Sequence, residues 1–289
     1  MRMNFLGRLA FGALRAYARV TPTQRGGYRL VRIGRRFVSP DLWRGSFATP
    51  GPATLQLDLS TYPDCCMACG LYELDTLRVL RRLLRRGMHF VDCGANIGYF
   101  TVLATRIVGE AGRVDALEPD PLNRARLDEH LSLNGLRDRV RVHAVAASDA
   151  AGSATLYHPV GDARNHGEAS LIRSAVGAAS ETYTVPTARL DDLLDHTPDL
   201  IKTDIEGAEL SALRGMSRLL RDARPPKLVI EHNPESARAA GHRCGDLLRA
   251  IHEANPGYRA HWIGWRLRGM TADQIDAMPR QGNILYQAI

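Results

Sequence analysis

The sequence lacks any apolar run of about 18 residues, the minimum for a helix that crosses a membrane. Cysteine is scarce, with five residues in 289, and the number is odd. A disulfide framework is therefore not expected, whereas a reducing, cytoplasmic compartment is. Lysine is nearly absent as well: there are two, so arginine carries almost all of the formal net charge of +7.

The basic charge has two interpretations. One is attraction to an anionic partner; the other, which we favour, is a compositional habit of the source genome. The basic residues are not interleaved with aromatic residues in the manner of nucleic-acid-binding motifs, so no nucleic-acid partner is expected. The remaining composition, with 45% hydrophobic and 24% charged residues, is that of an ordinary globular protein.

The first 20 residues contain no acidic side chain and no serine. A helical projection places Arg8, Arg15 and Arg19 on one face and apolar residues on the other. This basic amphipathic helix either packs on the rest of the protein with its arginines in water, which we favour, or lies on an anionic membrane surface. A secretory signal is not favoured, because arginines interrupt the apolar residues.

Cys66 and Cys69 have the CxxC spacing of a metal-binding pair. A structural zinc site needs a second pair of ligands, and the sequence has no second CxxC and no HxxxH. We therefore interpret these cysteines, and Cys65 beside them, as buried or surface thiols and expect no metal there.

The most informative stretch is a short apolar run that ends at Asp92 and opens a loop with Gly94, Asn96 and Gly98. A helical pattern follows, and strand, loop and helix in this order form a ligand site in α/β proteins. An acid before the loop suits a ligand with an ammonium group and repels pyrophosphate. Glu118 follows Gly98 by 20 residues and can accept both hydroxyl groups of a ribose. An amino acid at one end and a ribose at the other describe S-adenosylmethionine (SAM).

A nicotinamide dinucleotide is the main rival ligand. Its fingerprint has glycines at the first, third and sixth positions of the loop. Here the first, third and fifth positions are Gly94, Asn96 and Gly98. This spacing, together with the acid at Asp92, weighs against an NAD-dependent oxidoreductase.

Two later strands also end in ionisable residues. Asp204 and Glu206 follow the first of these strands, and Glu231 and His232 end the second. Side chains at the carboxyl ends of parallel strands face the ligand cleft. As a candidate general base we rank His232 first, then Asp204, then Glu206. Asp204 and Glu206 have an alternative role as ligands of a divalent cation, although we expect no metal. His232 has an alternative role as a satisfied strand-end histidine.

Residues 158–181 interrupt the alternation of strands and helices. They are rich in Gly, Ala and Ser, contain His166, and lie between strands expected at 154–157 and 182–185. We interpret this insert either as a substrate-facing lid or, with equal weight, as a disordered insert.

Four motifs together resemble the FkbM family of SAM-dependent methyltransferases. In order, they are DCGANIGYFT from Asp92, EPDP from Glu118, LDD from Leu190 and IKTDIEGAE from Ile201. Their order and spacing agree over roughly residues 71–234, more than half of the chain.

The resemblance implies a class I methyltransferase fold of the Rossmann-like α/β class. Such a fold has a seven-stranded, mostly parallel sheet with helices on both faces and an antiparallel last strand. We expect this domain over residues 71–289, after an N-terminal extension over residues 1–70 that contains the basic helix.

The resemblance also assigns residues to parts of the cofactor. Glu118 would hold the ribose. Adenine recognition is expected near the end of the third strand, through backbone groups or through Asp149. The residues assigned to the methionine part of SAM are Asp92, Gly94, Asn96 and Gly98.

The activity implied is O-methylation, the transfer of a methyl group from SAM to a hydroxyl oxygen of a carbohydrate or secondary metabolite. The expected partner is a small-molecule or glycan acceptor. The alternative is a non-catalytic SAM-fold binding module that docks a partner or a membrane through residues 1–20. In that case the protein would be peripheral at the membrane instead of free in the cytoplasm.

Overall fold

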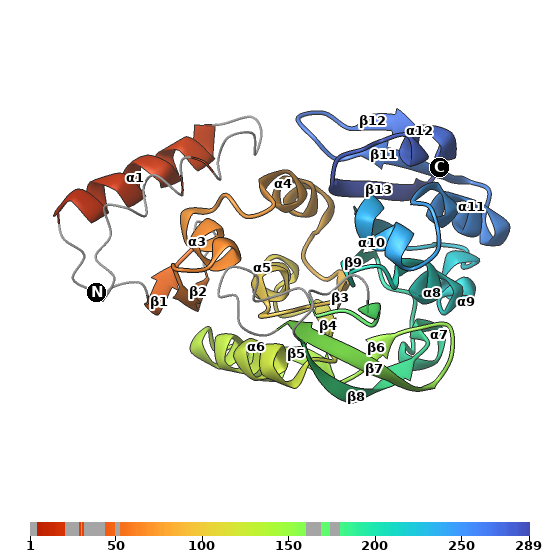
Figure 1. Cartoon of the computed structure of the whole chain (residues 1–289), viewed down its shortest axis with the longest axis horizontal. Helices are drawn as coiled ribbons and strands as arrows, with labels where there is room; N and C mark the ends of the chain where they lie inside the picture. The colour runs from red at the N-terminus through yellow and green to blue at the C-terminus, as the bar shows by residue number, and fades with distance from the viewer. Residues whose placement is uncertain are drawn as a thin grey trace.

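The computed structural model describes residues 5–20, 29, 31, 44–49, 53–159, 169–173 and 180–289 (Figure 1). Most of the insert expected over residues 158–181, including His166, lies outside these described residues.

An eight-stranded sheet forms the centre of the described chain. Five adjacent strands are parallel, in the order β10 (Lys227–His232), β9 (Leu200–Thr203), β3 (His89–Cys93), β4 (Arg113–Leu117) and β5 (Val140–His143). Beyond β10 follow three strands, each antiparallel to its neighbour: β13 (Gly282–Ala288), β11 (Tyr258–Trp262) and β12 (Arg268–Met270). The predicted mostly parallel α/β sheet with an antiparallel last strand is confirmed. The short edge strand β12 adds an eighth strand to the seven expected.

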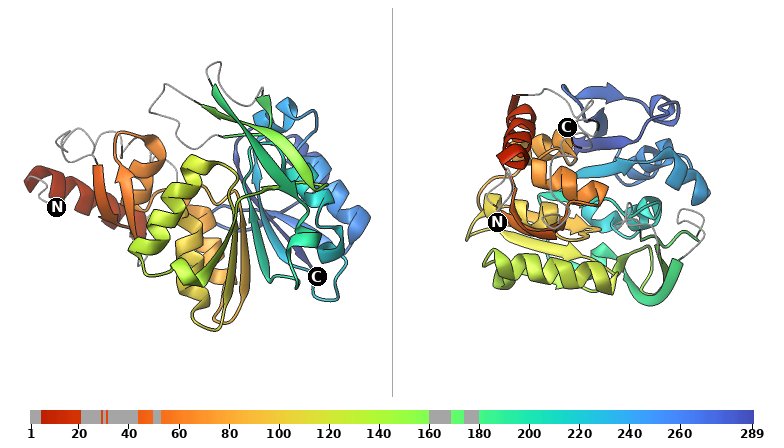
Figure 2. Two further views of the ribbon diagram at one scale, coloured as in Figure 1. Left: turned by 90° about the horizontal axis from the view of Figure 1, so that it is seen from below. Right: turned by 60° about the vertical axis from the view of Figure 1, so that its left-hand side comes forward.

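Helices cover both faces of the sheet. Successive side chains along a strand point to opposite faces, so each central strand contributes to a hydrophobic core on either side. In β3, Phe90 lies in the core on one face and Val91 in the core on the other. Figure 2 shows helices on both sides of the strands. The helices of the first face are α4 (Leu74–Leu83), α5 (Tyr99–Val108) and α6 (Pro121–Leu133). Those of the second face include α8 (Glu209–Arg214), α9 (Ser217–Leu220) and α11 (Gly245–Ala254).

The segment of the chain between β5 and β9 forms a second, smaller sheet. It contains β6 (Ala146–Ala147), β8 (Ser180–Ala188) and β7 (Gly152–Pro159), in that spatial order. β7 and β8 are antiparallel, so the two added strands expected around the insert do pair with each other. The remaining short helices are α7 (Leu190–Leu193), α10 (Pro234–Ala239), α12 (Ala272–Asp276) and the 3₁₀ turn Arg137–Arg139.

The first helix, α1 (Phe5–Val20), lies at the edge of the molecule beside α3 (Tyr62–Cys69), β1 (Arg44–Ala48) and β2 (Thr54–Asp58) (Figure 1). Its Leu14 and Ala18 side chains are buried. Arg15 donates from Nη2 to the carbonyl oxygen of Ala68, 3.2 Å away, and to that of Ala48. The helix is therefore packed, but Arg15 points into the interface instead of into water.

Among the described residues, no helix combines the length and the apolar character that crossing a membrane requires. The cysteines of α3, Cys65, Cys66 and Cys69, are buried and unbridged, as the interpretation as thiols predicted. Burial raises the pKa of the Cys66 thiol well above its usual range. In the part of the chain that the structure describes, no cluster with metal-ligand geometry includes these cysteines.

Candidate functional site

A cavity opens at the carboxyl ends of β3, β4 and β9, the edge where the sequence predicts the ligand. It encloses about 880 Å³, counting the space toward its open side. The predicted residues that line it are Gly94, Asn96, Glu118, Asp204 and Glu206. The predicted residues outside its wall are Asp92, Gly98, Asp149 and His232.

The loop after β3 depends on its two glycines. Gly94 has a φ of +80°, and a Cβ atom there would lie 1.9 Å from the carbonyl oxygen of Asp204. Gly98 has a φ of +87°, and a Cβ atom there would lie 2.4 Å from Cδ1 of Leu127. The first clash is with backbone, which cannot turn aside as a side chain can. Gly94 therefore allows the β3 loop to lie directly against the end of β9.

Glu118, at the end of β4, is held by the β3 loop. Its side chain is 4% exposed. Oε2 accepts a 2.7 Å hydrogen bond from the backbone amide of Asn96, and Oε1 accepts one of 2.9 Å from the amide of Asp120. Burial raises the pKa of Glu118 to about 8, although these two amides oppose the shift. The carboxylate is fixed in the cavity wall, and each oxygen keeps a second lone pair for a ribose hydroxyl.

Asp92 lies beneath the loop and not in the cavity wall. It is 1% exposed, and its Oδ2 accepts a 2.6 Å hydrogen bond from Oγ1 of Thr101 in α5. Burial raises its pKa to about 6, against the opposing charge of Lys202. Oδ1 is buried and has no hydrogen-bond partner among the described residues. An unsatisfied buried oxygen of this kind fits a position that gains a donor or a cation when a ligand binds.

The wall expected to face adenine is apolar. Val145 and the β6 residues Ala146 and Ala147 line the cavity, together with Leu156 of β7. Asp149 lies further along on the surface, where its backbone amide donates to Oγ of Ser211 at 3.1 Å. Of the two alternatives for adenine, the structure thus places the backbone of the strand end in the cavity wall and the Asp149 side chain outside it.

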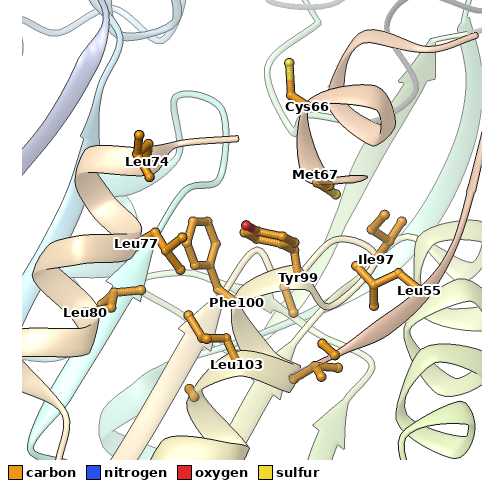
Figure 3. Close-up of a cluster of buried hydrophobic side chains, with 14 of the residues drawn as sticks. Leu55, Cys66, Met67, Leu74, Leu77, Leu80, Ile97, Tyr99, Phe100 and Leu103 are labelled. Carbon is orange, nitrogen blue, oxygen red and sulfur yellow. The ribbon is translucent and has the colours of Figure 1, made fainter. Parts of the chain in front are cut away.

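An aromatic wall faces the glycine loop. Tyr99 and Phe100, the first two residues of α5, line the cavity together with Met67 of α3. Figure 3 shows Tyr99 and Phe100 between Met67 and the leucines of α4. Tyr72 completes this wall, with its ring edge-on to that of Tyr99 at a centroid distance of 5.4 Å. Packed aromatic rings limit the access of water to this side of the cavity.

Three carboxylates gather where β9 and β10 end. Asp204, Glu206 and Glu231 each offer an oxygen, and these oxygens lie within 4.8 Å of one another. The structure thus adds Glu231 to the pair for which the sequence allowed a cation. The pKa of Glu231 is raised well above its ordinary value by burial and by the neighbouring acids. Gln281 stabilises it by donating from Nε2 to Oε1 at 2.6 Å.

His232, ranked first as a base from the sequence, points away from this group. It is 1% exposed, and its Nε2 lies 3.0 Å from the carbonyl oxygen of Met278. Its ring meets that of Trp262 edge-on at 5.4 Å, and burial lowers its pKa. Because side chains alternate along β10, Glu231 faces the acids and His232 the opposite side. His232 is thus a buried strand-end histidine, close to the alternative given above, although its Nδ1 has no hydrogen-bond partner among the described residues.

Lys202 is the residue of this site that sequence reasoning missed. It lies in β9, is 2% exposed and lines the cavity. Its Nζ donates to Oδ2 of Asp204 at 2.9 Å and lies 4.8 Å from the centroid of the Phe100 ring. One signal was present in the sequence: a lysine inside an apolar strand, in a chain with two lysines.

The cavity wall therefore combines two chemically distinct groups of residues. Glu118 and the apolar strand end fit the ribose and adenine of the predicted cofactor. Lys202, Asp204 and Glu206 are charged groups that can orient a polar acceptor and receive a proton.

The family profile described as "Methyltransferase FkbM domain" matches residues 92–259 of the chain. Two curated relatives are similar over shorter stretches. A ribosomal protein L11 methyltransferase of Pelotomaculum thermopropionicum is 31% identical over 117 residues, which are 40% of this chain and 36% of that protein. Methyltransferase sdnD of Sordaria araneosa is 31% identical over 154 residues, 44% of this chain and 59% of that protein. The chain thus covers less than two thirds of the length of either relative.

Solved structures show more distant likeness. A methyltransferase FkbM from Methylobacillus flagellatus KT is 22% identical, with a TM-score of 0.45 over 76% of this chain and 54% of that one. An O-methyltransferase from Bacillus cereus, solved in complex with SAH, is 14% identical, with a TM-score of 0.44 over 74% of this chain and 80% of that one.

Proposed function

Because the chain belongs to the FkbM methyltransferase family, we propose that it transfers a methyl group from SAM to a hydroxyl oxygen of a carbohydrate or secondary-metabolite acceptor. The family match covers residues 92–259, more than half of the chain. The observation that supports the proposal is that one cavity is lined both by Glu118, which follows β4, and by Asp204 and Glu206, which follow β9.

SAM is the cofactor of this family and hence of the chain. Bound SAM supplies a methyl carbon that its sulfonium already makes electrophilic. The residues proposed to hold it are Glu118 at the ribose, the Gly94–Gly98 loop at the methionine part, and the β6 backbone at adenine. Holding a nucleophile in line with the methyl carbon can lower the barrier by about 7 to 11 kcal/mol at best.

A hydroxyl oxygen becomes a good nucleophile only when its proton has an acceptor. A positioned base contributes about 10²- to 10⁴-fold to such a step. Asp204 lines the cavity and its side chain is 20% exposed. Glu206 also lines the cavity, whereas His232 does not. We therefore place Asp204 first and Glu206 second as the base, and give His232 a structural role.

There are two alternatives to methylation of a small molecule or glycan, and an experiment can separate them. One is the non-catalytic binding module, which would bind SAM without turnover. The other is a macromolecular acceptor, since one relative is named for ribosomal protein L11. The polar residues of the cavity wall and the absence of an aromatic-interleaved basic motif favour a small molecule or glycan. The five buried, unbridged cysteines are compatible with the cytoplasmic location that we include in this proposal.

The proposal is tested in two steps. Calorimetric titration with S-adenosylhomocysteine (SAH) should give micromolar binding that Glu118→Ala and Asp92→Ala abolish. Glu253→Ala, an exposed acid of α11, is the control and should bind as wild type. Transfer of labelled methyl from SAM is then measured on hydroxylated sugars, polyketides, ribosomal RNA and ribosomal protein. Labelling of RNA or protein would mean that the acceptor is a macromolecule and not a small molecule or glycan. SAH binding without labelling of any acceptor class would favour the binding module.

A further inference from the structure

Lys202 is an unusual residue for the position it holds. A lysine ammonium is strongly hydrated, and burying it costs several kcal/mol unless it is paired. Lys202 is nevertheless 2% exposed, in the middle of the sheet, with its ammonium against the Phe100 ring. The second lysine, Lys227, lies exposed at the start of β10. The chain thus keeps one of its two lysines in the wall of the functional cavity.

The groups around Lys202 keep it charged. Its direct partner is Asp204, at 2.9 Å, and the carboxylates of Glu73 and Asp92 also interact with it. Burial alone would lower the pKa of Lys202, but these three carboxylates raise it above its ordinary value. Glu73 is in turn held by Nδ2 of Asn283, 3.0 Å from its Oε2. The ammonium is therefore a permanent positive charge at the base of the cavity.

The ion pair joins Lys202 to one of the two carboxylate oxygens of Asp204. Lys202 holds Oδ2 of Asp204, while 20% of the Asp204 side chain remains exposed. The backbone of Asp204 is fixed too, because its amide donates to the carbonyl oxygen of Cys93 at 3.0 Å and its own carbonyl lies against Gly94. One oxygen of the carboxylate is thus held by the protein, while the side chain as a whole stays partly exposed in the cavity wall.

We propose that Lys202 is a positioning residue for methyl transfer, which holds Asp204 by Oδ2 so that Oδ1 faces the acceptor hydroxyl and accepts its proton. This inference rests on the proposed function. The acceptor oxygen forms its bond to the methyl carbon as the carbon–sulfur bond breaks and SAH is released. The hydroxyl proton passes to Asp204 Oδ1 and from there to water.

The geometry also separates this role from that of a metal. A divalent cation shared by Asp204, Glu206 and Glu231 would use carboxylate oxygens as its ligands. Lys202 already provides a positive charge at Asp204 Oδ2, within hydrogen-bond distance. With the lysine as the counter-charge of Asp204, we expect a chelator to leave turnover unchanged.

The test compares Lys202→Met, Asp204→Asn and the double variant with Lys227→Met, the control lysine. Lys202→Met and Asp204→Asn should each lower kcat by about 10²-fold or more, with the SAH dissociation constant changed by less than about threefold. The double variant should be no slower than Asp204→Asn, because a positioning residue has nothing to position once the base is gone. Lys227→Met should match wild type.

The split between kcat and KM provides a readout that a purely structural role would not give. Lys202→Met should lower kcat and kcat/KM by the same factor and leave the KM of the acceptor within about threefold of wild type, because positioning the base matters only in the transition state. If Lys202→Met does not fold, Lys202→Arg is measured in its place. It keeps the charge, should bind SAH as wild type, and should recover most of the turnover with the wild-type KM of the acceptor.

Three results would overturn the inference. If Lys202→Met weakened SAH binding by the same factor by which it lowered kcat/KM, Lys202 would be a cofactor ligand. Fully additive losses in the double variant would mean that Lys202 acts without Asp204. Activity abolished by a chelator and restored by Mg²⁺ would assign the counter-charge to a metal. Wild-type protein without turnover on any acceptor would instead contradict the proposed function, which keeps the two failures distinct.

Discussion

The backbone amide of Asn96 donates a 2.7 Å hydrogen bond to Oε2 of Glu118. This contact joins the loop after β3 to the end of β4, two segments that each supply part of the proposed cofactor site. It also fixes the carboxylate that we propose for the ribose, since the amide of Asp120 binds its other oxygen. A change at Glu118 should therefore disturb both the loop and the ligand.

Glu118 should make the stability of the protein fall as pH rises. Burial raises its pKa from 4.5 to about 8, so the folded state holds a proton that the unfolded state releases between these values. The free energy of unfolding should thus decrease between about pH 4.5 and 8, by up to a few kcal/mol. Glu118→Gln should remove this part of the dependence. Denaturant titrations of both proteins at pH 5, 6.5 and 8 measure it, and parallel curves would contradict the assignment.

Gly94→Ala should abolish SAH binding and lower the free energy of unfolding by at least about 3 kcal/mol, because its Cβ would meet the Asp204 carbonyl. Gly87→Ala is a matched control: Gly87 has a φ of +83°, close to the +80° of Gly94, but nothing lies within 4 Å of a Cβ there. Gly87→Ala should cost only about 1 kcal/mol of backbone strain and leave SAH binding intact. Calorimetric titration and thermal unfolding test both variants, and equal losses in the two would exclude the clash as the cause.

The local structure around the site was predictable where it is set by chain geometry. A strand, a loop with glycines and a helix follow one another at Asp92, Gly94 and Gly98, and parallel β4 must then place Glu118 beside the loop. The helices between successive strands are consistent with parallel strands, whereas the mostly parallel seven-stranded sheet was expected from the family resemblance.

The parts that sequence reasoning missed depend on contacts between distant segments. Whether Glu231 or His232 faces Asp204 and Glu206 is decided by the register of β10 against β13, which pairs Glu231 with Asn283 and His232 with Gly282. A shift of one residue would exchange the two side chains. Lys202 was missed because its carboxylate neighbours, such as Glu73, come from segments far away in the chain.

His232→Ala should therefore lower stability without lowering turnover per folded molecule. The side chain is buried against Trp262 and bonded to the carbonyl of Met278, so its loss leaves a cavity and an unpaired acceptor. We expect a cost of about 2 to 4 kcal/mol in the free energy of unfolding. His196→Ala, an exposed histidine, is the control. A loss of kcat in His232→Ala at full folding would restore His232 as the base.

Arg15 should hold α1 against the rest of the protein, although basic helices of this kind also bind membranes. Its guanidinium bonds the carbonyl oxygens of Ala68, at the end of α3, and of Ala48, at the end of β1. Arg15→Gln should remove these bonds, at a cost of about 1 to 2 kcal/mol, and increase hydrogen exchange in residues 5–20. Arg44→Gln, which loses an ion pair in which the Arg44 side chain is 85% exposed, should change exchange little. Unchanged protection of α1 in Arg15→Gln, with wild-type protein binding anionic vesicles, would favour the membrane surface over the packed interface.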